Sequence, residues 1–341
     1  MPKTYTEIEN WIITEVKPTE SNSAAQTYER LERVAGNLPF IDVPQDFSLE
    51  PHFVEEAQVC DFRTHLAGCQ EILDVGCGDG WPLLRIAPFF PSVTGIDASA
   101  RRVRTCLANA ERLGIRNVRV QQMSATELNF ADNTFDGVVA ASSIEQTPDP
   151  YQALREVFRV LKPRGRFRLF FEAYESEDKG VVERVFLTEN EESLGYHYVL
   201  KHHRPAWERN YLVRFSPVPA MKEEFHRLRD LIERLGPVPA QAPEIGVRFL
   251  QQNRQHISGG SWYELEHFTS ATMKATLEEI GFVNVRICYS AGTFARKIWP
   301  SIKEQGLSIS QHQALCRGLA ELTSELQAPA GLGEPVIATK P

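Results

Sequence analysis

Three closely spaced glycines follow a short apolar run in the segment EILDVGCGDGWP, residues 71–82. Gly76, Gly78 and Gly80 alternate there with other residues. Because glycine has no Cβ atom, a loop of this kind lets the backbone pass close to a bound ligand. In open α/β sheets, ligands bind beyond the carboxyl ends of the strands, where this loop would lie. The segment therefore indicates a ligand-binding loop, with an ordinary strand-to-helix turn as the alternative.

The glycine spacing departs from the dinucleotide fingerprint G-x-G-x-x-G. The third glycine of that fingerprint would fall on Trp81, which Pro82 follows. That glycine allows the helix to pack closely on the strand, and an indole ring cannot replace it. The observed pattern is G-x-G-x-G, with Asp74 two residues before the first glycine. These differences disfavour a dinucleotide as the ligand.

A carboxylate follows the next apolar run and offers a second contact to a nucleoside. Asp97 lies nineteen residues after Gly78, at the end of the run SVTGID. A carboxylate at this position can accept hydrogen bonds from both ribose hydroxyls. This favours a nucleoside with free 2′ and 3′ hydroxyls but leaves an NAD-type ribose and another adenosine open. The alternative is that Asp97 only stabilises the start of the following helix through backbone N–H groups.

Short apolar runs alternate with helical patterns after residue 71. Runs rich in Val, Ile and Phe predict buried strands over 71–76, 92–97, 118–123, 135–142 and 166–173. Helical spacing predicts helices over 99–114 and 148–165, with Ser99 as an N-cap and a turn at 162–165. A further helix and strand are expected over 267–290, and a last strand over 334–340. Such alternation predicts parallel strands with helices on both faces of the sheet.

Four segments, in this order, resemble the motifs of class I S-adenosylmethionine (SAM)-dependent methyltransferases, especially the small-molecule enzymes of quinone biosynthesis. LDVGCGDG resembles their first motif, and GIDAS (95–99) resembles their acidic motif after the second strand. FADNTFDGVVAASSIEQTPDP (130–150) resembles their fourth-strand segment, and REVFRVLKPRGRF (155–167) is similar to their next helix, turn and strand. The resemblance covers 71–173 strongly and 267–290 and 334–340 more weakly.

The resemblance implies a Rossmann-like, doubly wound α/β fold. Its sheet would have seven mostly parallel strands and an antiparallel C-terminal strand. The alternation of strands and helices stops over 174–265 and then resumes, which indicates an insertion or lid rather than a separate second domain. We therefore expect an N-terminal helical cap (1–70), a SAM-binding core (71–173), a substrate-facing insertion (174–265) and the C-terminal part of the core (266–341).

SAM is the cofactor that the resemblance implies, and a small organic molecule is the expected methyl acceptor. Methyl transfer from a sulfonium is an in-line displacement with a good neutral leaving group, so the protein mainly positions the reactants. Such positioning can lower a barrier by roughly 7–11 kcal/mol. A general base is needed only when the acceptor atom carries a proton.

The resemblance also assigns residues to the cofactor. The loop would pass along the methionine part, Asp74 would bind the amino group directly or through water, and Asp97 would hold the ribose. Other contacts would border the adenine or the transferable methyl group. The complete expected set is Asp74, Gly76, Cys77, Gly78, Gly80, Asp97, Ala98, Ser124, Ala125, Ala141 and Ser142.

Two positions depart from the family pattern. Many relatives carry Asp where this chain has Ser124, and many carry His where it has Gln146, which cannot act as a general base. Four titratable side chains near predicted strand ends are candidates for a base, although the sequence assigns this role to none of them: Glu145, Glu172, Tyr174 and His197.

Two other functions remain open. The departures at Ser124 and Gln146 allow a SAM-binding sensor or assembly protein without catalysis. A nicotinamide-dependent oxidoreductase is the third hypothesis, and the bulk of Trp81 counts against it.

The composition limits the kinds of partner and the cellular compartment that we expect for this protein. The chain has 341 residues and a formal net charge of −8, which counts against general nucleic-acid binding. Clusters such as ARRVR (100–104) and KHHR (201–204) are typical of solvated faces. We expect no signal peptide and no membrane span, because no apolar stretch is long enough. Six cysteines without a C-x-x-C pair favour a reduced, cytoplasmic protein.

The histidine and aromatic residues of the insertion carry less information. His197, His202 and His203 lack the spacing of a zinc site, so we expect no metal. The aromatic side chains in this region fit either a packed interior or a substrate wall, and they are Tyr196, Tyr198, Trp207 and Tyr211. The sequence does not indicate an oligomeric state.

Overall fold

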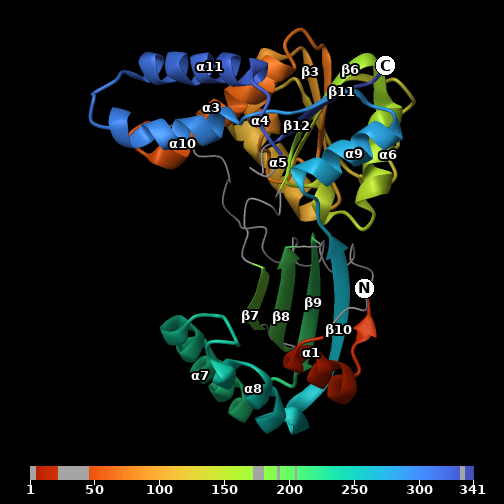
Figure 1. Cartoon of the computed structure of the whole chain (residues 1–341), viewed down its shortest axis with the longest axis vertical. Helices are drawn as coiled ribbons and strands as arrows, with labels where there is room; N and C mark the ends of the chain where they lie inside the picture. Colours follow the sequence, from red (N-terminus) through yellow and green to blue (C-terminus); the bar gives the residue numbers. More distant parts are fainter. Residues whose placement is uncertain (1–4, 22–45, 172–179, 190–192, 204–205, 331–334) are drawn as a thin grey trace. The chain divides into compact units, whose positions relative to one another are not determined.

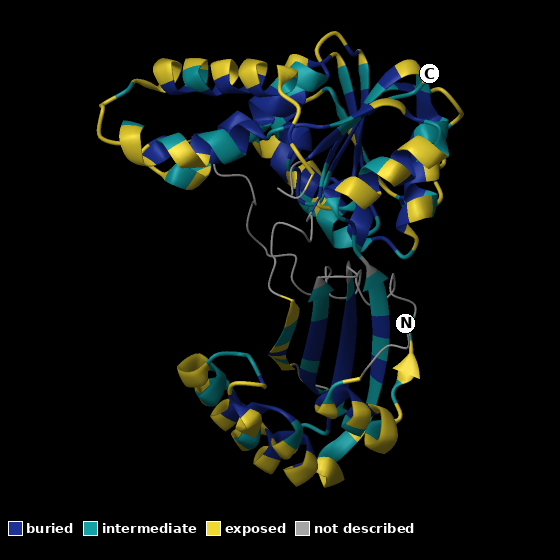
Figure 2. Cartoon of the chain, in the orientation of Figure 1, coloured by how far each residue is buried: buried dark blue, intermediate teal, exposed yellow. Residues whose placement is uncertain are grey.

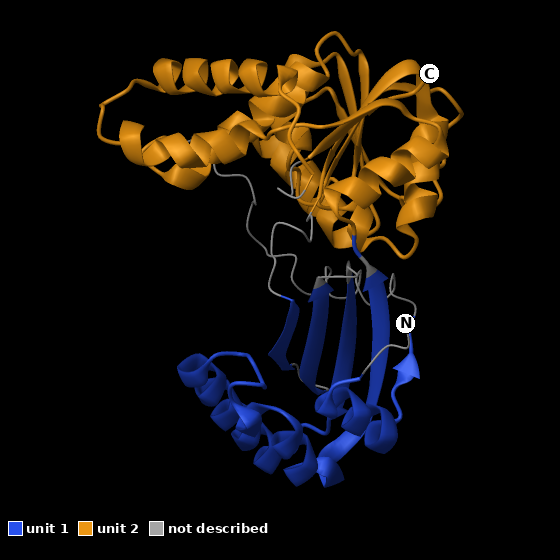
Figure 3. Ribbon diagram, viewed as in Figure 1, with its two compact units in different colours: residues 1–25, 177–267 blue, residues 26–176, 268–341 orange. Residues whose placement is uncertain are grey.

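The computed structural model describes the chain except residues 1–4, 22–45, 172–179, 190–192, 204–205 and 331–334. The chain divides into two compact units, which Figure 3 shows in different colours. Unit 1 comprises residues 1–25 and 177–267, and unit 2 comprises residues 26–176 and 268–341. Each unit has its own β-sheet and its own hydrophobic core.

Unit 2 is built on a seven-stranded sheet with the strand order β11-β12-β6-β5-β2-β3-β4 (Figure 1). The strands are β2 (Glu71–Val75), β3 (Ser92–Asp97), β4 (Val118–Gln122), β5 (Phe135–Ala141), β6 (Leu161–Phe170), β11 (Val283–Ile287) and β12 (Val336–Thr339). All neighbours are parallel except β12, which runs antiparallel to both β6 and β11. This arrangement confirms the predicted α/β fold with a mostly parallel sheet and an antiparallel C-terminal strand.

Helices cover both faces of this sheet, and the burial pattern in Figure 2 follows from that. The helices of unit 2 are α3 (Glu50–His65), α4 (Leu83–Ile86), α5 (Ala100–Arg112), α6 (Pro150–Val160), α9 (Ser270–Ile280), α10 (Ala291–Ile302) and α11 (Ile309–Glu325). On one face, Val157 of α6 and Leu277 of α9 share a core with Phe167. On the other, Phe62 of α3 and Cys106 of α5 share a core with other strand residues. Burial on both faces explains the nearly continuous apolar runs of the strands.

Side chains at the helix starts set the points where strands give way to helices. The Ser99 hydroxyl accepts a hydrogen bond from the backbone N–H of Arg102 at 3.1 Å, as its predicted N-cap role requires. Asp149 caps α6 in the same way through the N–H of Gln152. Helix α6 ends at Val160. The segment 162–165, which was predicted as a turn, lies within β6, where the pairing of β6 with β5 shifts in register.

Unit 1 contains a five-stranded sheet with the order β1-β10-β9-β8-β7. The strands are β1 (Thr19–Glu20), β7 (Val181–Glu189), β8 (Leu194–His203), β9 (Ala206–Phe215) and β10 (Ile257–Glu266). The helices α1 (Glu7–Trp11), α7 (Pro219–Leu235) and α8 (Val247–Gln252) supply side chains to the core on this sheet. The region expected as an insertion therefore folds together with α1 from the N-terminal segment, whereas α3 belongs to unit 2.

The aromatic side chains of the inserted region form the interior of unit 1. Tyr196, Tyr198 and Tyr211 are almost completely buried and belong to one hydrophobic core with Phe225 and Phe249. The packed-interior interpretation of these residues therefore holds for the three tyrosines. None of the helices in the described ranges combines the length and the apolar character that a membrane span needs.

A buried ion pair joins α1 to the sheet of unit 1. Arg209 Nη1 lies 3.2 Å from Glu9 Oε1, and the two side chains are 1% and 0% exposed. Burial raises the pKa of Glu9, while the nearby Arg209 acts in the opposite direction. The carboxylate therefore depends on its cation, because a buried charge without a partner is strongly unfavourable.

We predict that Arg209→Met lowers the free energy of unfolding of unit 1 by about 3–5 kcal/mol, because the Glu9 carboxylate loses its buried partner. Hydrogen exchange of the amides in β8 and β9 reports on this unit specifically. The control is Arg229→Met, since the exposed pair of Arg229 with Glu189 at 3.3 Å should contribute less than about 1 kcal/mol. Equal exchange rates in the two variants would contradict the assigned role of the buried pair.

Candidate functional site

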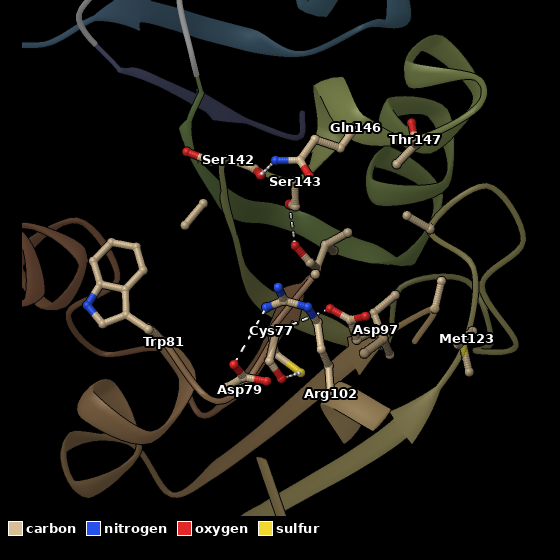
Figure 4. A pocket seen from close by; sticks show the side chains of 17 residues that line it. Cys77, Asp79, Trp81, Asp97, Arg102, Met123, Ser142, Ser143, Gln146 and Thr147 are labelled. Carbon is tan, nitrogen blue, oxygen red and sulfur yellow. Dashed lines mark hydrogen bonds and ion pairs between the residues drawn. The ribbon is translucent and has the colours of Figure 1, made fainter. Parts of the chain in front are cut away.

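A cavity of about 350 Å³ lies beside the carboxyl ends of β2, β3 and β5 in unit 2 (Figure 4). Its lining comes from the glycine loop after β2, from Asp97 at the end of β3 and from Ala141 at the end of β5. Open α/β sheets bind ligands at this edge, and small-molecule pockets begin at about 300 Å³. The position and size of the cavity therefore fit a bound nucleoside or a similar molecule.

Most of the residues that the sequence assigns to the cofactor line this cavity. They are Gly76, Cys77, Gly78, Asp97, Ala98, Ala125, Ala141 and Ser142. Asp74, Gly80 and Ser124 do not line it. Ser124 Oγ instead lies 2.8 Å from the Thr126 hydroxyl, within the loop after β4.

The glycine loop is held in place by β3 and by the turn after β5. The backbone N–H groups of Gly76 and Cys77 both donate to the carbonyl oxygen of Ile96, at 2.8 and 2.9 Å. Gly76 has a φ of +80°, and a Cβ atom there would lie 2.3 Å from the Cβ atom of Ser143. Only glycine fits both the backbone angle and this close approach. The loop geometry therefore requires glycine at position 76.

Asp97 connects the loop to the start of α5. Its Oδ2 accepts a hydrogen bond from Gly78 N at 3.0 Å, and its Oδ1 accepts one from Ser99 N at 2.9 Å. The side chain is almost buried, and this burial raises the pKa of Asp97. A carboxylate offers about four lone-pair sites, so two backbone donors leave acceptor capacity for ribose hydroxyls. The structural role at the helix start and a role in ligand binding are therefore compatible.

Asp74 lies inside the sheet rather than on the cavity wall. It is completely buried in β2, which pairs with β3 on one side and β5 on the other. Burial raises the pKa of Asp74 well above its ordinary value, because charge is unfavourable in this environment. A contact to a ligand amino group remains a prediction for this residue.

Arg102 is a cavity residue that sequence reasoning missed. The segment ARRVR was interpreted as a solvated face, but Arg102 lines the cavity, and its Nη1 lies 3.8 Å from Asp79 Oδ2 (Figure 4). That interpretation was wrong for Arg102, because the first turn of α5 begins at the ligand-binding edge of the sheet. Its position three residues after the N-cap Ser99 was the available signal.

The remaining wall residues come from three short segments. Trp81 lies on the opposite side of the drawn cavity from Asp97, and its Nε1 has no hydrogen-bond partner among the described residues (Figure 4). Gln146 Nε2 donates to the carbonyl oxygen of Ser142 at 2.6 Å, which fixes the turn after β5. The volume of about 350 Å³ is present with Trp81 as a wall, so the indole does not fill the cavity.

The four candidate bases are not brought together on this cavity. Glu145 is buried beside it but is not part of its lining, and Glu172 and Tyr174 lie outside the described residues. His197 belongs to β8 of unit 1, where its Nε2 lies 2.9 Å from the Thr188 hydroxyl. The part of the chain that the structure describes contains no cluster of three or more His, Cys, Asp or Glu side chains suited to a metal ion.

Cys77 is buried in the cavity wall and carries a neutral thiol. A side-chain hydrogen bond with Cys106 and burial hold the pKa of Cys77 well above its ordinary value. A thiol is nucleophilic only as the thiolate. Cys77 therefore contributes shape rather than reactivity.

A parallel sheet with a glycine loop and an acidic residue at its ligand-binding edge defines a Rossmann-like nucleoside-binding domain. Residues 73–169, which include the loop and Asp97, match the family model described as a methyltransferase domain. The match is limited to this segment, which is similar to the class I SAM-dependent methyltransferases, and SAM is the cofactor of that class.

Curated relatives match the same part of the chain. An uncharacterized methyltransferase of Bacillus subtilis is 37% identical over 31% of this chain and 42% of its own length. The demethylmenaquinone methyltransferase of Listeria welshimeri is 36% identical over 35% of this chain and 56% of its own length. The chain thus spans about half the length of the curated relatives that it matches. Among solved structures, the cyclase SpnF is 17% identical, with a TM-score of 0.47 over 95% of this chain and 98% of that one.

We predict that Gly76→Ala weakens binding of S-adenosylhomocysteine by at least about tenfold, or 1.4 kcal/mol. The added Cβ must displace Ser143 and deform the loop. Gly114→Ala is the matched control, because Gly114 also has a positive φ, of +67°, but no atom within 4 Å of an added Cβ. Calorimetric titration measures both affinities. Unchanged affinity in the Gly76 variant would show that this loop does not contact the ligand.

We also predict opposite effects of Asp74→Asn on stability and on ligand affinity. Because the pKa of Asp74 is raised in the folded state, the folded protein binds a proton that the unfolded chain has released. Wild-type stability therefore falls as the pH rises above about 3.9, the ordinary pKa of Asp, toward the raised folded value. The Asn variant lacks this loss and should be more stable at pH 8, whereas its affinity for S-adenosylhomocysteine should fall about tenfold.

Denaturant unfolding from pH 4 to pH 8 and calorimetric titration measure the two effects of Asp74→Asn. Asp149→Asn is the control, since Asn is also a good N-cap and this exposed position lies outside the cavity lining. Unchanged affinity in the Asp74 variant would contradict the predicted contact to the ligand amino group.

Proposed function

We propose that the protein is a SAM-dependent methyltransferase that transfers a methyl group to a small organic acceptor. The observation that carries the proposal is the coincidence of three features on one cavity. The family match at 73–169, the glycine loop with its close approach at Gly76, and Asp97 all meet there.

Several features of the cavity match chemical groups of SAM. Gly76 and Gly78 line the cavity without side chains, so the loop can present its backbone to a ligand. Asp97 retains acceptor capacity for ribose hydroxyls at one side of the cavity, and Ala98, Met123 and Ala125 provide a mostly apolar wall for an adenine ring. At the other side, Trp81 Nε1 is a buried donor that an oxygen of the ligand can satisfy.

The residues of this cavity act by positioning. SAM supplies an activated methyl group on its sulfonium when it is bound. The turn after β5, fixed by the bond from Gln146 to the Ser142 carbonyl, would border the transferable methyl group. A fixed turn at this place would help to hold the acceptor in line with the methyl group, and such positioning can lower the barrier by roughly 7–11 kcal/mol.

The acceptor is best described as a small organic molecule. The name of the Listeria relative refers to demethylmenaquinone, and similarity over 35% of this chain supports a comparable class without naming the compound. In the described part of the chain, the titratable residues on the cavity wall are Cys77, Asp79, Asp97 and Arg102, and none of them is a free base near the turn after β5.

A SAM-binding protein without catalysis is the second candidate function. Gln146 occupies the position of a frequent family histidine, and the described cavity wall offers no base beside it. The same cavity then serves as a ligand-dependent sensor site. The distinction between the two functions rests on turnover and not on binding.

Calorimetric titration with SAM and with S-adenosylhomocysteine tests the binding step, and we expect saturable binding of both. Incubation with methyl-labelled SAM and a panel of small quinols, phenols and amines tests transfer, and we expect one labelled product. Binding without any product across the panel would favour the sensor function. Absence of binding by folded protein would refute both functions.

A further inference from the structure

A second cavity, of about 290 Å³, lies in unit 2 and shares no lining residue with the cofactor cavity. It is enclosed by the end of α3, by strands β6, β11 and β12, and by the last turn of α11. Its lining includes three arginines and one acidic residue, which are Arg166, Arg168, Arg286 and Glu325. Neither the family match nor the proposed function accounts for this concentration of positive charge.

Strand register brings the three arginines to one face of the sheet. Ile337 of β12 pairs with Arg168 on one side and with Arg286 on the other, so these residues form one row across three strands. Arg166 lies two residues before Arg168 on β6 and therefore points to the same face. The alternate residues, including Phe167 and Val285, are buried in the hydrophobic core on the opposite face.

Arg168 is the central cation of this group and has unused donors. It is 1% exposed, and its Nη2 contacts Asp61 Oδ2. Its Nε and Nη1 have no hydrogen-bond partner among the described residues. Buried polar groups are nearly always hydrogen-bonded, so these N–H groups indicate an acceptor that is missing from the protein itself.

The other two guanidinium groups are held at the cavity by backbone acceptors. Arg286 Nη2 donates to the Ser324 carbonyl at 3.5 Å, and Arg166 Nη2 donates to the Ala67 carbonyl. Neither contact neutralises the charge, because both acceptors are uncharged carbonyl groups. Backbone anchors of this kind orient the side chains before any ligand arrives, which lowers the entropy cost of binding.

The three arginines exceed the two nearby carboxylates, Asp61 and Glu325, so the local charge is about one positive unit. Asp61 is completely buried behind Arg168 and offsets one of the three guanidinium charges. Glu325 is exposed at the cavity edge. His65 also lines the cavity. Burial and the nearby Arg168 lower the pKa of His65, so its ring is neutral at pH 7 and adds no charge to the cavity.

We propose that this cavity binds a tetrahedral oxyanion of the phosphate class. The planar fork of a guanidinium matches phosphate oxygens in a bidentate manner, and several arginines around one cavity are typical of phosphate recognition. A phosphate in the cavity would balance the excess charge of the half-buried Arg166 and Arg286, with Arg168 as a third lining cation. The volume accommodates inorganic phosphate or a phosphate on a small organic group, and the proposal does not depend on methyl transfer.

Calorimetric titration of the full chain with inorganic phosphate and with ribose 5-phosphate tests the proposal, against sodium chloride at equal ionic strength. We expect saturable binding of one anion per chain. Tighter binding of the ester would identify a phosphorylated small molecule as the ligand, and equal or weaker binding of the ester would identify free phosphate. No saturable binding of either compound by folded protein would overturn the proposal.

Arg286→Gln is the most informative variant, because Arg286 is half-buried and its loss leaves no buried carboxylate without a partner. We expect phosphate affinity to fall roughly 10- to 100-fold, as for loss of one charge-assisted contact. Arg166→Gln should act in the same direction. Arg155→Gln is the control, since Arg155 is exposed on α6 and bonds only the nearby Gln152 in the described chain.

Thermal unfolding in chloride confirms that each variant is folded, and this readout is independent of both cavities. Wild-type phosphate affinity in both Arg286→Gln and Arg166→Gln would overturn the assignment of the cavity, even if the chain binds phosphate elsewhere. Reduced affinity in these variants with unchanged affinity in Arg155→Gln would support it.

Discussion

The close contact between the loop after β2 and the turn after β5 is the constraint on which the cavity at the strand ends depends. Gly76 lies so near Ser143 that no side chain fits, and its amide is bonded to the Ile96 carbonyl of β3. Three neighbouring strands are thereby connected at their carboxyl ends through one glycine. Asp97 extends this connection, because its two oxygens join the loop to the start of α5. The cavity is the space that remains above these contacts.

Polar groups in unit 2 gather at two separate places on the same sheet. The carboxyl ends of β2, β3 and β5 carry the glycine loop and Asp97, as is usual where parallel strands end together. The face of β6, β12 and β11 toward α3 carries three arginines instead of apolar side chains. A sheet face that is covered by helices normally excludes charge, since an unpaired buried charge is costly. Charged residues at such a place therefore indicate a ligand or a structural pair, and Asp61 pairs with only one of the arginines.

Unit 1 is organised differently, because its sheet is almost entirely antiparallel and carries helices on a core rich in tyrosine and phenylalanine. Its buried polar groups include pairs within the unit, such as Glu9 with Arg209 and Tyr198 with Glu183. Such pairing is expected for a self-contained hydrophobic core. The family match at 73–169 does not include this unit. The two units therefore differ in architecture, and the segment that matches the family model lies in unit 2.

Local sequence determined the parallel core and most of the lining of the cavity beside β2, β3 and β5. Apolar runs, Ser99 as an N-cap and the glycine loop each act through neighbours in the chain, so their structure could be predicted from short segments. The cavity position of Arg102 and the row of Arg168 and Arg286 were decided only by tertiary structure. The same holds for the joint folding of α1 with the inserted strands. The physical reason is that strand register and helix packing join residues far apart in sequence, and no local pattern specifies which distant side chains will meet.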